Sequence, residues 1–340
     1  MIEPSTALLH KDVDALASLA VNPAYWRRLV PGLTVEGPAA GAVAGRRKST
    51  AGPGGALARM QVEGFCEGGA VLSKGEARAL RAGMDAVAAA GWPDVFVYLF
   101  DEPWNAARTP RARALLSALL ADGYVQIPDF WAYRTPAGPG HHGHGPHRDV
   151  LWPLLMADRR PVSLTLWVPV TDATLDNGCI SVVPMNLELD DHPTDELVSH
   201  YGPDFTAAAL LHRARALPAP AGHALSWNHF IRNWGGFSSA QAKAPCLALA
   251  WEFMRADQGF WSHPHTHFTE AAVPSPPMVF DPAAPLPSFR QRLYLVGRMC
   301  VRYLHHVSGN TALFRALAPL LLAEGYPGTR GQTRRHRGPG

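Results

Sequence analysis

The chain has 340 residues, of which 47% are hydrophobic and 17% charged, so it can bury a large core and is long enough for one large domain with helical additions. The formal charge of +3 is small, and part of it lies in the basic segment 326–340, which Gly and Pro interrupt. We expect this segment to be a disordered, solvated tail. Binding to nucleic acid is therefore not indicated.

The cysteines and the hydropathy pattern both favour a reduced, soluble protein. The four cysteines are far apart and form no CxxC pair, so a disulfide framework is not expected. The first twenty residues are acidic where a signal peptide needs a basic start, and no later segment approaches about 18 uncharged apolar residues. We expect a cytoplasmic protein with no membrane partner.

Residues 1–61 are predicted to form an N-terminal helical extension that ends in a mobile, Gly-rich loop at about residues 41–55. The main domain is predicted to span residues 62–325. In it, Ser73 and Glu76 form a capping-box pattern ahead of apolar residues at helical spacing, which predicts a helix as far as Gly91.

A second helix is expected from about Pro110 to Ala121, where leucines recur at helical spacing. Between the two helices, Asp101 and Glu102 are adjacent carboxylates without a partner motif. We expect them to be exposed caps or turns.

After Gly123 the sequence changes to short runs rich in aromatic and β-branched residues, with turn signals such as Asn177-Gly178 between them. These runs predict strands at residues 124–133, 162–170, 179–183, 224–230 and 246–253. Several short strands joined by loops favour a sandwich or barrel over a parallel α/β sheet. Helical spacing returns from Phe289 to about Ala323, so helices are expected outside the sheets.

The densest group of potential metal ligands lies in the segment 141–149, HHGHGPHRD. Side chains alternate in an extended segment, so His147 and Asp149 project from one face and can hold one cation together. A third ligand from a distant strand would complete a 2-His-1-carboxylate facial triad, which leaves positions open for a cosubstrate and O2. His141, His142 and His144 have glycine between them, which favours a flexible, solvated loop.

The sequence after His147-Arg148-Asp149 resembles a known family. Residues 163–184, SLTLWVPVTDATLDNGCISVVP, closely resemble the strand–turn–strand signature of phytanoyl-CoA dioxygenase-like enzymes, and residues 62–80 resemble the family's N-terminal entry helix. The resemblance spans about residues 62–253. It implies a mainly β fold, namely a double-stranded β-helix (a cupin-like jelly roll) with flanking α-helices at both ends.

The resemblance also implies an activity, that of a non-haem iron oxygenase. Such an enzyme uses Fe(II), O2 and 2-oxoglutarate to oxidise a small metabolite or carrier-bound intermediate, with hydroxylation as the expected reaction. His147 and Asp149 match the proximal metal ligands of the family. Trp167 matches an aromatic residue that lines the cosubstrate pocket. Tyr133 lies near a position that faces the same pocket, with an ordinary sheet tyrosine as the alternative.

Two positions depart from the family pattern. Asn233 stands where the family has its distal histidine, and an amide carbonyl is a weaker ligand than imidazole. His229 is the alternative ligand; along an unbroken strand it would lie about 13 Å from Asn233, so it needs a bulge or a register shift. Cys246 stands where an arginine binds the far carboxylate of 2-oxoglutarate, and Lys243 and Arg232 are the nearest sources of positive charge.

These departures leave three outcomes open. The enzyme uses 2-oxoglutarate through substitute contacts, or uses a metal and O2 without 2-oxoglutarate, or has kept the scaffold as a non-catalytic binding protein. The histidines of the segment 261–267, WSHPHTH, alternate at strand spacing and are candidates for a replacement ligand, with a polar loop as the alternative.

Overall fold

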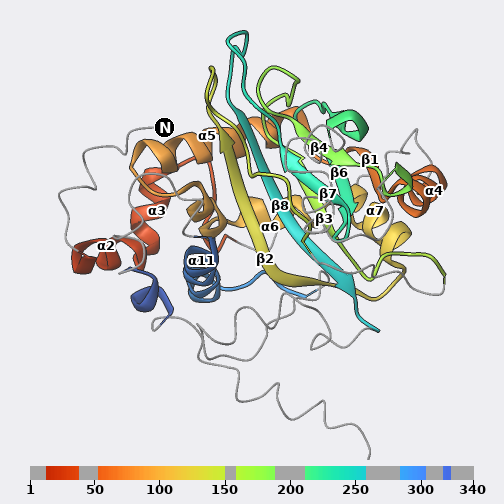
Figure 1. The fold of residues 1–340 in the computed structure, drawn as a ribbon. Helices are drawn as coiled ribbons and strands as arrows, with labels where there is room; N and C mark the ends of the chain where they lie inside the picture. The colour runs from red at the N-terminus through yellow and green to blue at the C-terminus, as the bar shows by residue number, and fades with distance from the viewer. Residues whose placement is uncertain are drawn as a thin grey trace, which may run out of the picture.

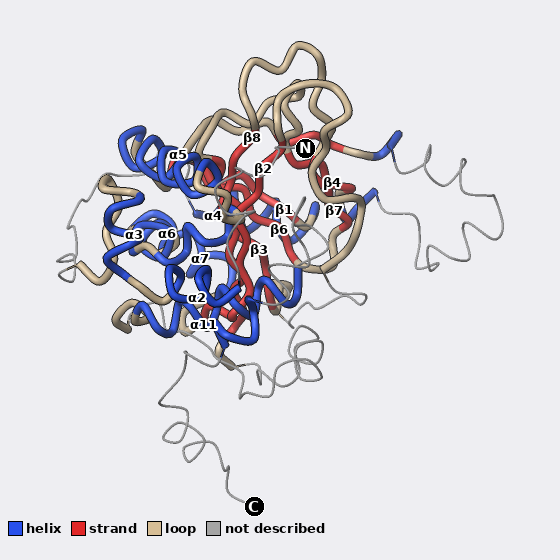
Figure 2. The backbone as a smooth tube through the Cα atoms, turned by 90° about the vertical axis from the view of Figure 1, so that its left-hand side faces the viewer, coloured by secondary structure: helices blue, strands red, loops and turns tan. Residues whose placement is uncertain are grey.

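The computed structural model describes residues 13–37, 53–149, 158–187, 211–257, 284–303 and 317–322. The long strands β2 (Tyr124–Thr135) and β8 (Cys246–Arg255) run side by side through the middle of the molecule (Figure 1). Seen from the side, helices cover one face of the larger sheet, and strands β4 (Ile180–Val183) and β7 (Arg232–Gly235) lie beyond its other face (Figure 2).

Two antiparallel sheets form the centre of the protein. The five-stranded sheet has the order β1-β6-β3-β8-β2, and the three-stranded sheet has the order β5-β4-β7. The strands not yet given are β1 (Phe65–Ala70), β3 (Ser163–Pro169), β5 (Arg215–Leu217) and β6 (His223–Asn228). The helices are α2 (Val13–Ala20), α3 (Pro23–Leu29), α4 (Pro53–Glu63), α5 (Lys74–Ala89), α6 (Asp101–Ala106), α7 (Pro110–Leu120) and α11 (Phe289–Tyr303), with 3-10 turns η1 (Asp94–Leu99) and η2 (Met185–Leu187).

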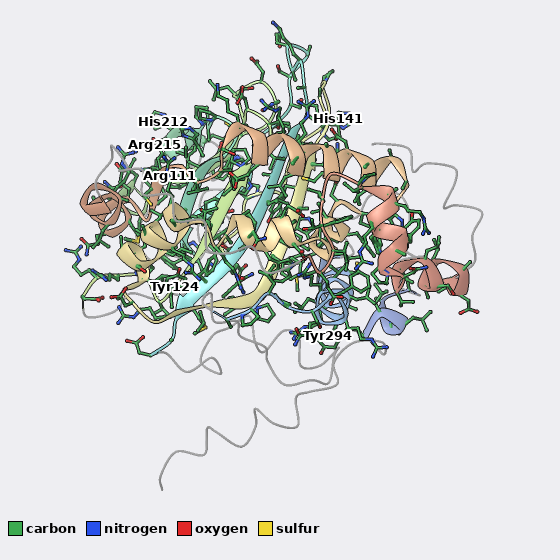
Figure 3. The ribbon with its side chains drawn as sticks, turned by 180° about the vertical axis from the view of Figure 1, so that it is seen from behind. Arg111, Tyr124, His141, His212, Arg215 and Tyr294 are labelled. Carbon is green, nitrogen blue, oxygen red and sulfur yellow. The ribbon has the colours of Figure 1, made fainter. Side chains whose placement is uncertain are left out.

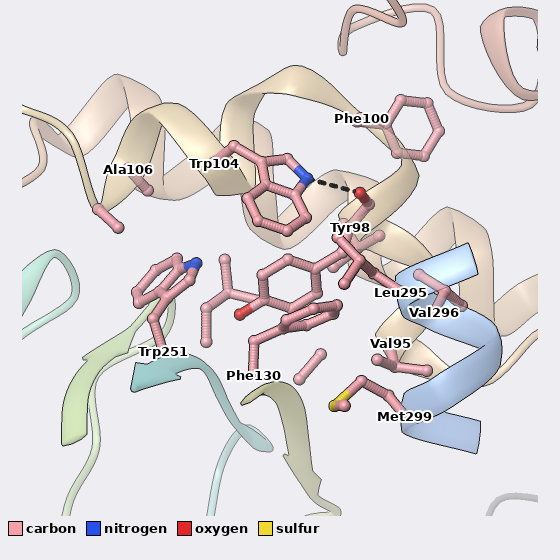
Figure 4. Close-up of a cluster of buried hydrophobic side chains, with 14 of the residues drawn as sticks. Val95, Tyr98, Phe100, Trp104, Ala106, Phe130, Trp251, Leu295, Val296 and Met299 are labelled. Atoms are coloured by element: carbon pink, nitrogen blue, oxygen red, sulfur yellow. Dashed lines mark hydrogen bonds between the residues drawn. The ribbon is translucent and has the colours of Figure 1, made fainter. Parts of the chain in front are cut away.

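Alternation along the strands separates two hydrophobic cores. On β3, Leu164, Leu166 and Val168 face the helices, whereas Trp167 faces the three-stranded sheet. The helix-side core is centred on Tyr98, whose hydroxyl donates to the main-chain oxygen of Ala250 at 2.8 Å (Figure 4). The second core lies between the sheets and contains Phe65, Trp167, Ile180, Val182, Leu225, Trp227, Cys246 and Ala248.

Much of the predicted secondary structure is confirmed. The Ser73–Glu76 capping box is present, with Ser73 Oγ accepting from Glu76 N and the Glu76 carboxylate accepting from Ser73 N. A helix begins at Pro110, and the predicted runs around residues 124–133, 162–170, 179–183 and 246–253 form β2, β3, β4 and β8. Of the C-terminal helical segment, residues 289–303 and 317–322 are helical.

Three local predictions were wrong. Helix α4 starts at Pro53, inside the expected loop, because Met60 gains burial in the helix-side core. Residues 65–70, in the segment likened to an entry helix, form strand β1, whose Phe65 and Cys66 are buried in opposite cores. The predicted strand 224–230 ends at Asn228, because its side-chain oxygen accepts from the main chains of Phe230 and Ile231 and turns the chain.

Asp101 is buried, contrary to the expectation of an exposed cap. Its carboxylate accepts from Thr34 Oγ1 and from the main-chain N–H groups of Glu36 and Gly37, and it forms an ion pair with the buried Arg292 of α11. The carboxylate therefore joins the segment after α3 to the C-terminal helix. Side chains of α2 and α3 also pack in the same core as the large sheet, including Leu16 and Trp26. The domain boundaries at residues 61 and 325 remain predictions.

Candidate metal centre

The histidine-rich segment lies against the edge of the three-stranded sheet. The main chains of His147 and Asn233 exchange two hydrogen bonds, of 3.0 Å and 2.9 Å, and His142 pairs with Phe237 further along. Figure 3 shows His141 and Tyr124 toward opposite ends of the molecule, so this segment lies at the end where β2 finishes. Directly opposed residues of an antiparallel pair project their side chains from the same face. His147 and Asn233 therefore share one face.

His147 and Asp149 converge as the sequence predicted. His147 Nε2 lies 3.2 Å from Asp149 Oδ1, and His147 Nδ1 lies 2.8 Å from the main-chain oxygen of Gly145. The other carboxylate oxygen, Asp149 Oδ2, accepts from Thr165 Oγ1 and Trp227 Nε1, both at 3.3 Å. Each of the two predicted ligands is thus oriented by a neighbour, as metal ligands usually are.

His147 and Asp149 shift each other's pKa toward their charged forms. Burial raises the pKa of the Asp149 carboxyl, but the hydrogen bond from His147 and the charges of His229 and His147 outweigh it and hold the pKa below its usual value. Burial lowers the pKa of His147, but the hydrogen bond and charge of Asp149 outweigh it and raise the pKa. Both shifts favour the charged forms, an imidazolium beside a carboxylate. A metal ligand must be the neutral imidazole, so a cation that binds here would displace this proton.

The two candidates for the third ligand differ in position. Asn233 is buried on β7, on the face of His147. His229 lies in the turn after β6, with Nδ1 2.8 Å from Ser163 Oγ and Nε2 3.7 Å from Glu252 Oε2. The expectation of one unbroken strand through both residues was wrong, because β6 and β7 belong to different sheets.

Of the residues predicted to bind the cosubstrate, two lie at the core between the sheets and one is exposed to solvent. Trp167 is buried between the sheets and Tyr133 packs against the same core, where Cys246 is also buried. The Trp167 Nε1–H group is buried and donates to no residue that the structure describes. Lys243 is exposed. The Trp167 N–H group is therefore suited to a bound molecule with a hydrogen-bond acceptor. Position 246 holds a cysteine, so it offers no guanidinium to the far carboxylate of 2-oxoglutarate.

Within the described residues, no three His, Cys, Asp or Glu side chains are placed to hold a metal ion as they stand. His147 and Asp149 fit two positions of an iron site, with the amide of Asn233 beside them. The candidates His263, His265 and His267 lie outside the described residues. In the described part of the chain, no helix is long and apolar enough to cross a membrane.

Residues 93–229 match the family model described as phytanoyl-CoA dioxygenase (PhyH). The predicted resemblance to the PhyH family is confirmed. The matched segment contains Tyr133, His147, Asp149 and Trp167 and ends before Asn233 and Cys246. This match agrees with the prediction of an iron-dependent oxygenase that uses Fe(II) and 2-oxoglutarate.

Several solved structures are similar to the chain. The epimerase SnoN, in complex with Fe3+, alpha ketoglutarate and nogalamycin RO, is 20% identical, with 69% of this chain and 96% of that chain covered and a TM-score of 0.49. HygX from Streptomyces hygroscopicus, with nickel and 2-oxoglutarate bound, is 12% identical, with coverages of 59% and 86% and a TM-score of 0.48. The carbocyclase SnoK from nogalamycin biosynthesis is 18% identical, with coverages of 72% and 98% and a TM-score of 0.47. No curated protein matches the chain.

Sequence reasoning missed the residues that hold Asp149 in place. Trp227 is buried in the core between the sheets, and its indole N–H also donates to Asp149. Thr165 stands directly opposite Trp227 in the β3–β6 pairing, so both reach the same carboxylate oxygen. The available signal was strand alternation, which places Thr165 on the face of Trp167. The pairing register that brings it beside Trp227 is not visible in the sequence.

Proposed function

We propose that the protein is a non-haem iron oxygenase of the PhyH type, which oxidises a small metabolite or carrier-bound intermediate with O2, by hydroxylation. The observation that carries the proposal is the convergence of His147 Nε2 and Asp149 Oδ1 at 3.2 Å, inside the segment that matches the family. Bound Fe(II) would supply the redox chemistry, with 2-oxoglutarate as the source of two electrons.

The proposed fold is a double-stranded β-helix with flanking helices. Its support is the order of strand pairing. If the segment 141–147 is counted with the smaller sheet, that sheet has the order β5-β4-β7-(141–147), which faces β6-β3-β8-β2. The segments after β2 therefore alternate between the two sheets, except that β4 and β5 follow one another in the smaller sheet, and this order is that of a jelly roll. The proposed oxygenase domain spans residues 62–325, after an N-terminal extension and before a C-terminal tail.

The chain's own residues prepare the site in three ways. Thr165 and Trp227 hold one oxygen of Asp149, which leaves the other directed at His147. The Gly145 carbonyl fixes the His147 ring through Nδ1, so that Nε2 is the coordinating atom. The apolar side chains between the sheets exclude water, and the Trp167 indole offers an unused N–H to a carboxylate or keto oxygen there.

A second candidate function is oxidation with a metal and O2 but without 2-oxoglutarate. The observation that favours it is the side chain at position 246. Burial raises the pKa of the Cys246 thiol to about 12, further raised by nearby Cys179, so this group is neutral and offers no charge to a carboxylate. A non-catalytic binding protein is the third candidate, and it requires that no metal binds.

Anaerobic titration with Fe(II) tests the proposal. The wild-type protein should bind one equivalent of iron, and His147→Ala and Asp149→Ala should each weaken binding by at least about tenfold. Absence of stoichiometric metal in the wild type, or unchanged binding in both variants, contradicts an oxygenase. Succinate formed from 2-oxoglutarate under O2 supports the first candidate function, and O2 consumption without succinate supports the second.

A further inference from the structure

We propose that His144 is the third protein ligand of the metal. It would take the role of the family's distal histidine, whose place in this chain is held by Asn233. This inference rests on the proposed function, because it assumes a metal on His147 and Asp149. It begins from the contact between the His144 and His147 rings, whose centroids lie 4.2 Å apart at an interplanar angle of 68°.

A one-residue bulge explains how His144 reaches this position. His147 pairs with Asn233, so an unbroken ladder would pair residue 145 with Gly235. Instead the N–H of Gly235 donates to the oxygen of His144 at 2.9 Å, and His142 pairs with Phe237. The register therefore shifts by one residue between His144 and His147, around Gly145 and Pro146.

The bulge changes the direction of the side chains. Residues 144 and 147 are an odd number of positions apart and would project from opposite faces of a regular strand. Here the main-chain oxygen of His144 accepts from Gly235, and the rings of His144 and His147 are in contact, so the shift brings both imidazoles to one side of the segment. Pro146 suits this place, because it has no N–H to contribute to the ladder.

The distance between the rings is compatible with two ligands of one ion. With metal–nitrogen bonds of about 2.1 Å and an angle of about 90° between them, the centroids of two imidazoles lie about 4.5 Å apart. The observed 4.2 Å is close to that value. Rotation about the Cβ–Cγ bond of His144 redirects its nitrogens while the centroid hardly moves, and this torsion is broad in histidine. The ring is half-buried.

The other candidates are less suited to the role. The amide of Asn233 is a neutral oxygen donor, and its Nδ2 group lies 3.4 Å from the oxygen of Ile231. The His229 ring lies between Ser163 and Glu252. His142, two residues before His144, packs its ring against Phe237 with centroids 5.4 Å apart. His142 is therefore a matched control from the same segment.

The experiment is anaerobic calorimetric titration of full-length variants with Fe(II), and the visible spectrum of the Co(II) form. We expect His144→Ala to weaken Fe(II) binding by about tenfold or more and to change the Co(II) spectrum, with His142→Ala and Asn233→Ala within about twofold of the wild type. In the double variant H144A/N233H, the new imidazole lies opposite His147 and should restore most of the affinity.

Wild-type affinity in His144→Ala, or a tenfold loss in Asn233→Ala with none in His144→Ala, would overturn the assignment. Failure of the proposed function looks different, because His147→Ala would then also leave iron binding unchanged. Circular dichroism and thermal unfolding of the apo variants check folding. If His144→Ala does not fold, His144→Gln, which preserves polarity and bulk, is expected to show the same loss and its absence overturns the proposal.

Discussion

Trp227 Nε1, on strand β6, donates a hydrogen bond of 3.3 Å to Asp149 Oδ2. Asp149 also receives a hydrogen bond from Thr165, which stands opposite Trp227 in the neighbouring strand. A core tryptophan and a strand threonine therefore determine which carboxylate oxygen faces His147. This arrangement makes the orientation of Asp149 testable without changing a proposed ligand.

Trp227→Phe should weaken Fe(II) binding by about three- to tenfold, because it removes a hydrogen bond to Asp149 and keeps most of the apolar contact. Anaerobic titration with Fe(II) measures the effect. Trp251→Phe is the matched control, since Trp251 is equally buried and its indole N–H donates to no described residue. Equal losses in the two variants would show that the effect is one of packing.

Cys246→Arg should raise the affinity for 2-oxoglutarate, because it places a guanidinium where the second core is otherwise neutral. The larger side chain should also lower the free energy of unfolding by about 1 to 3 kcal/mol, through overpacking. Calorimetric titration of the Ni(II) form with 2-oxoglutarate measures the first effect, and urea unfolding measures the second. Lys243→Ala is the control and should leave the affinity unchanged, since Lys243 is exposed. A loss of affinity in that variant would instead assign the carboxylate contact to Lys243.

Gly235→Ala should destabilise the site, because a Cβ at this position would lie 2.6 Å from the Cα of Gly143. The histidine-rich segment would have to move away from β7, and we expect a loss of about 1 to 3 kcal/mol in the free energy of unfolding, with weaker iron binding. Gly145→Ala is the control for stability, since a Cβ there meets no atom within 4 Å. Thermal unfolding that is unchanged in Gly235→Ala would contradict the close approach.

Asp101→Asn should destabilise the protein in a pH-dependent way. Burial raises the pKa of Asp101, but Arg292 and the hydrogen bonds from Gly37 and Thr34 outweigh it and hold the pKa below its usual value. The ionised form is therefore favoured by folding, so its contribution is complete above the unfolded pKa of about 3.9 and is lost as the pH falls through the lower folded pKa.

At pH 7 the Asp101→Asn variant leaves Arg292 without its buried counter-charge, and we expect a loss of about 3 to 5 kcal/mol. The difference from the wild type should shrink below about pH 4. Urea unfolding at several pH values measures both effects. Asp85→Asn is the control, because its partly exposed ion pair with Arg134 should contribute at most about 1 kcal/mol. A difference that is constant with pH would exclude the ion pair as the cause.

Local patterns in the sequence determined much of this protein. The Ser73–Glu76 capping box, the alternation that predicts β3 and β8, and the extended pair His147 and Asp149 depend on residues a few positions apart, so they are visible in the sequence. The signature after Ser163 was specific enough to indicate the PhyH family, which the family match confirms.

Tertiary structure decided the features that depend on long-range register. The bulge around Gly145 exists only because the chain pairs with β7, about 90 residues later, so the sequence alone suggested that His144 belonged to a solvated loop. The burial of Asp101 likewise depends on Arg292, which lies far away in the sequence. Strand pairing across such distances is set by packing between sheets, and neither composition nor local periodicity records it.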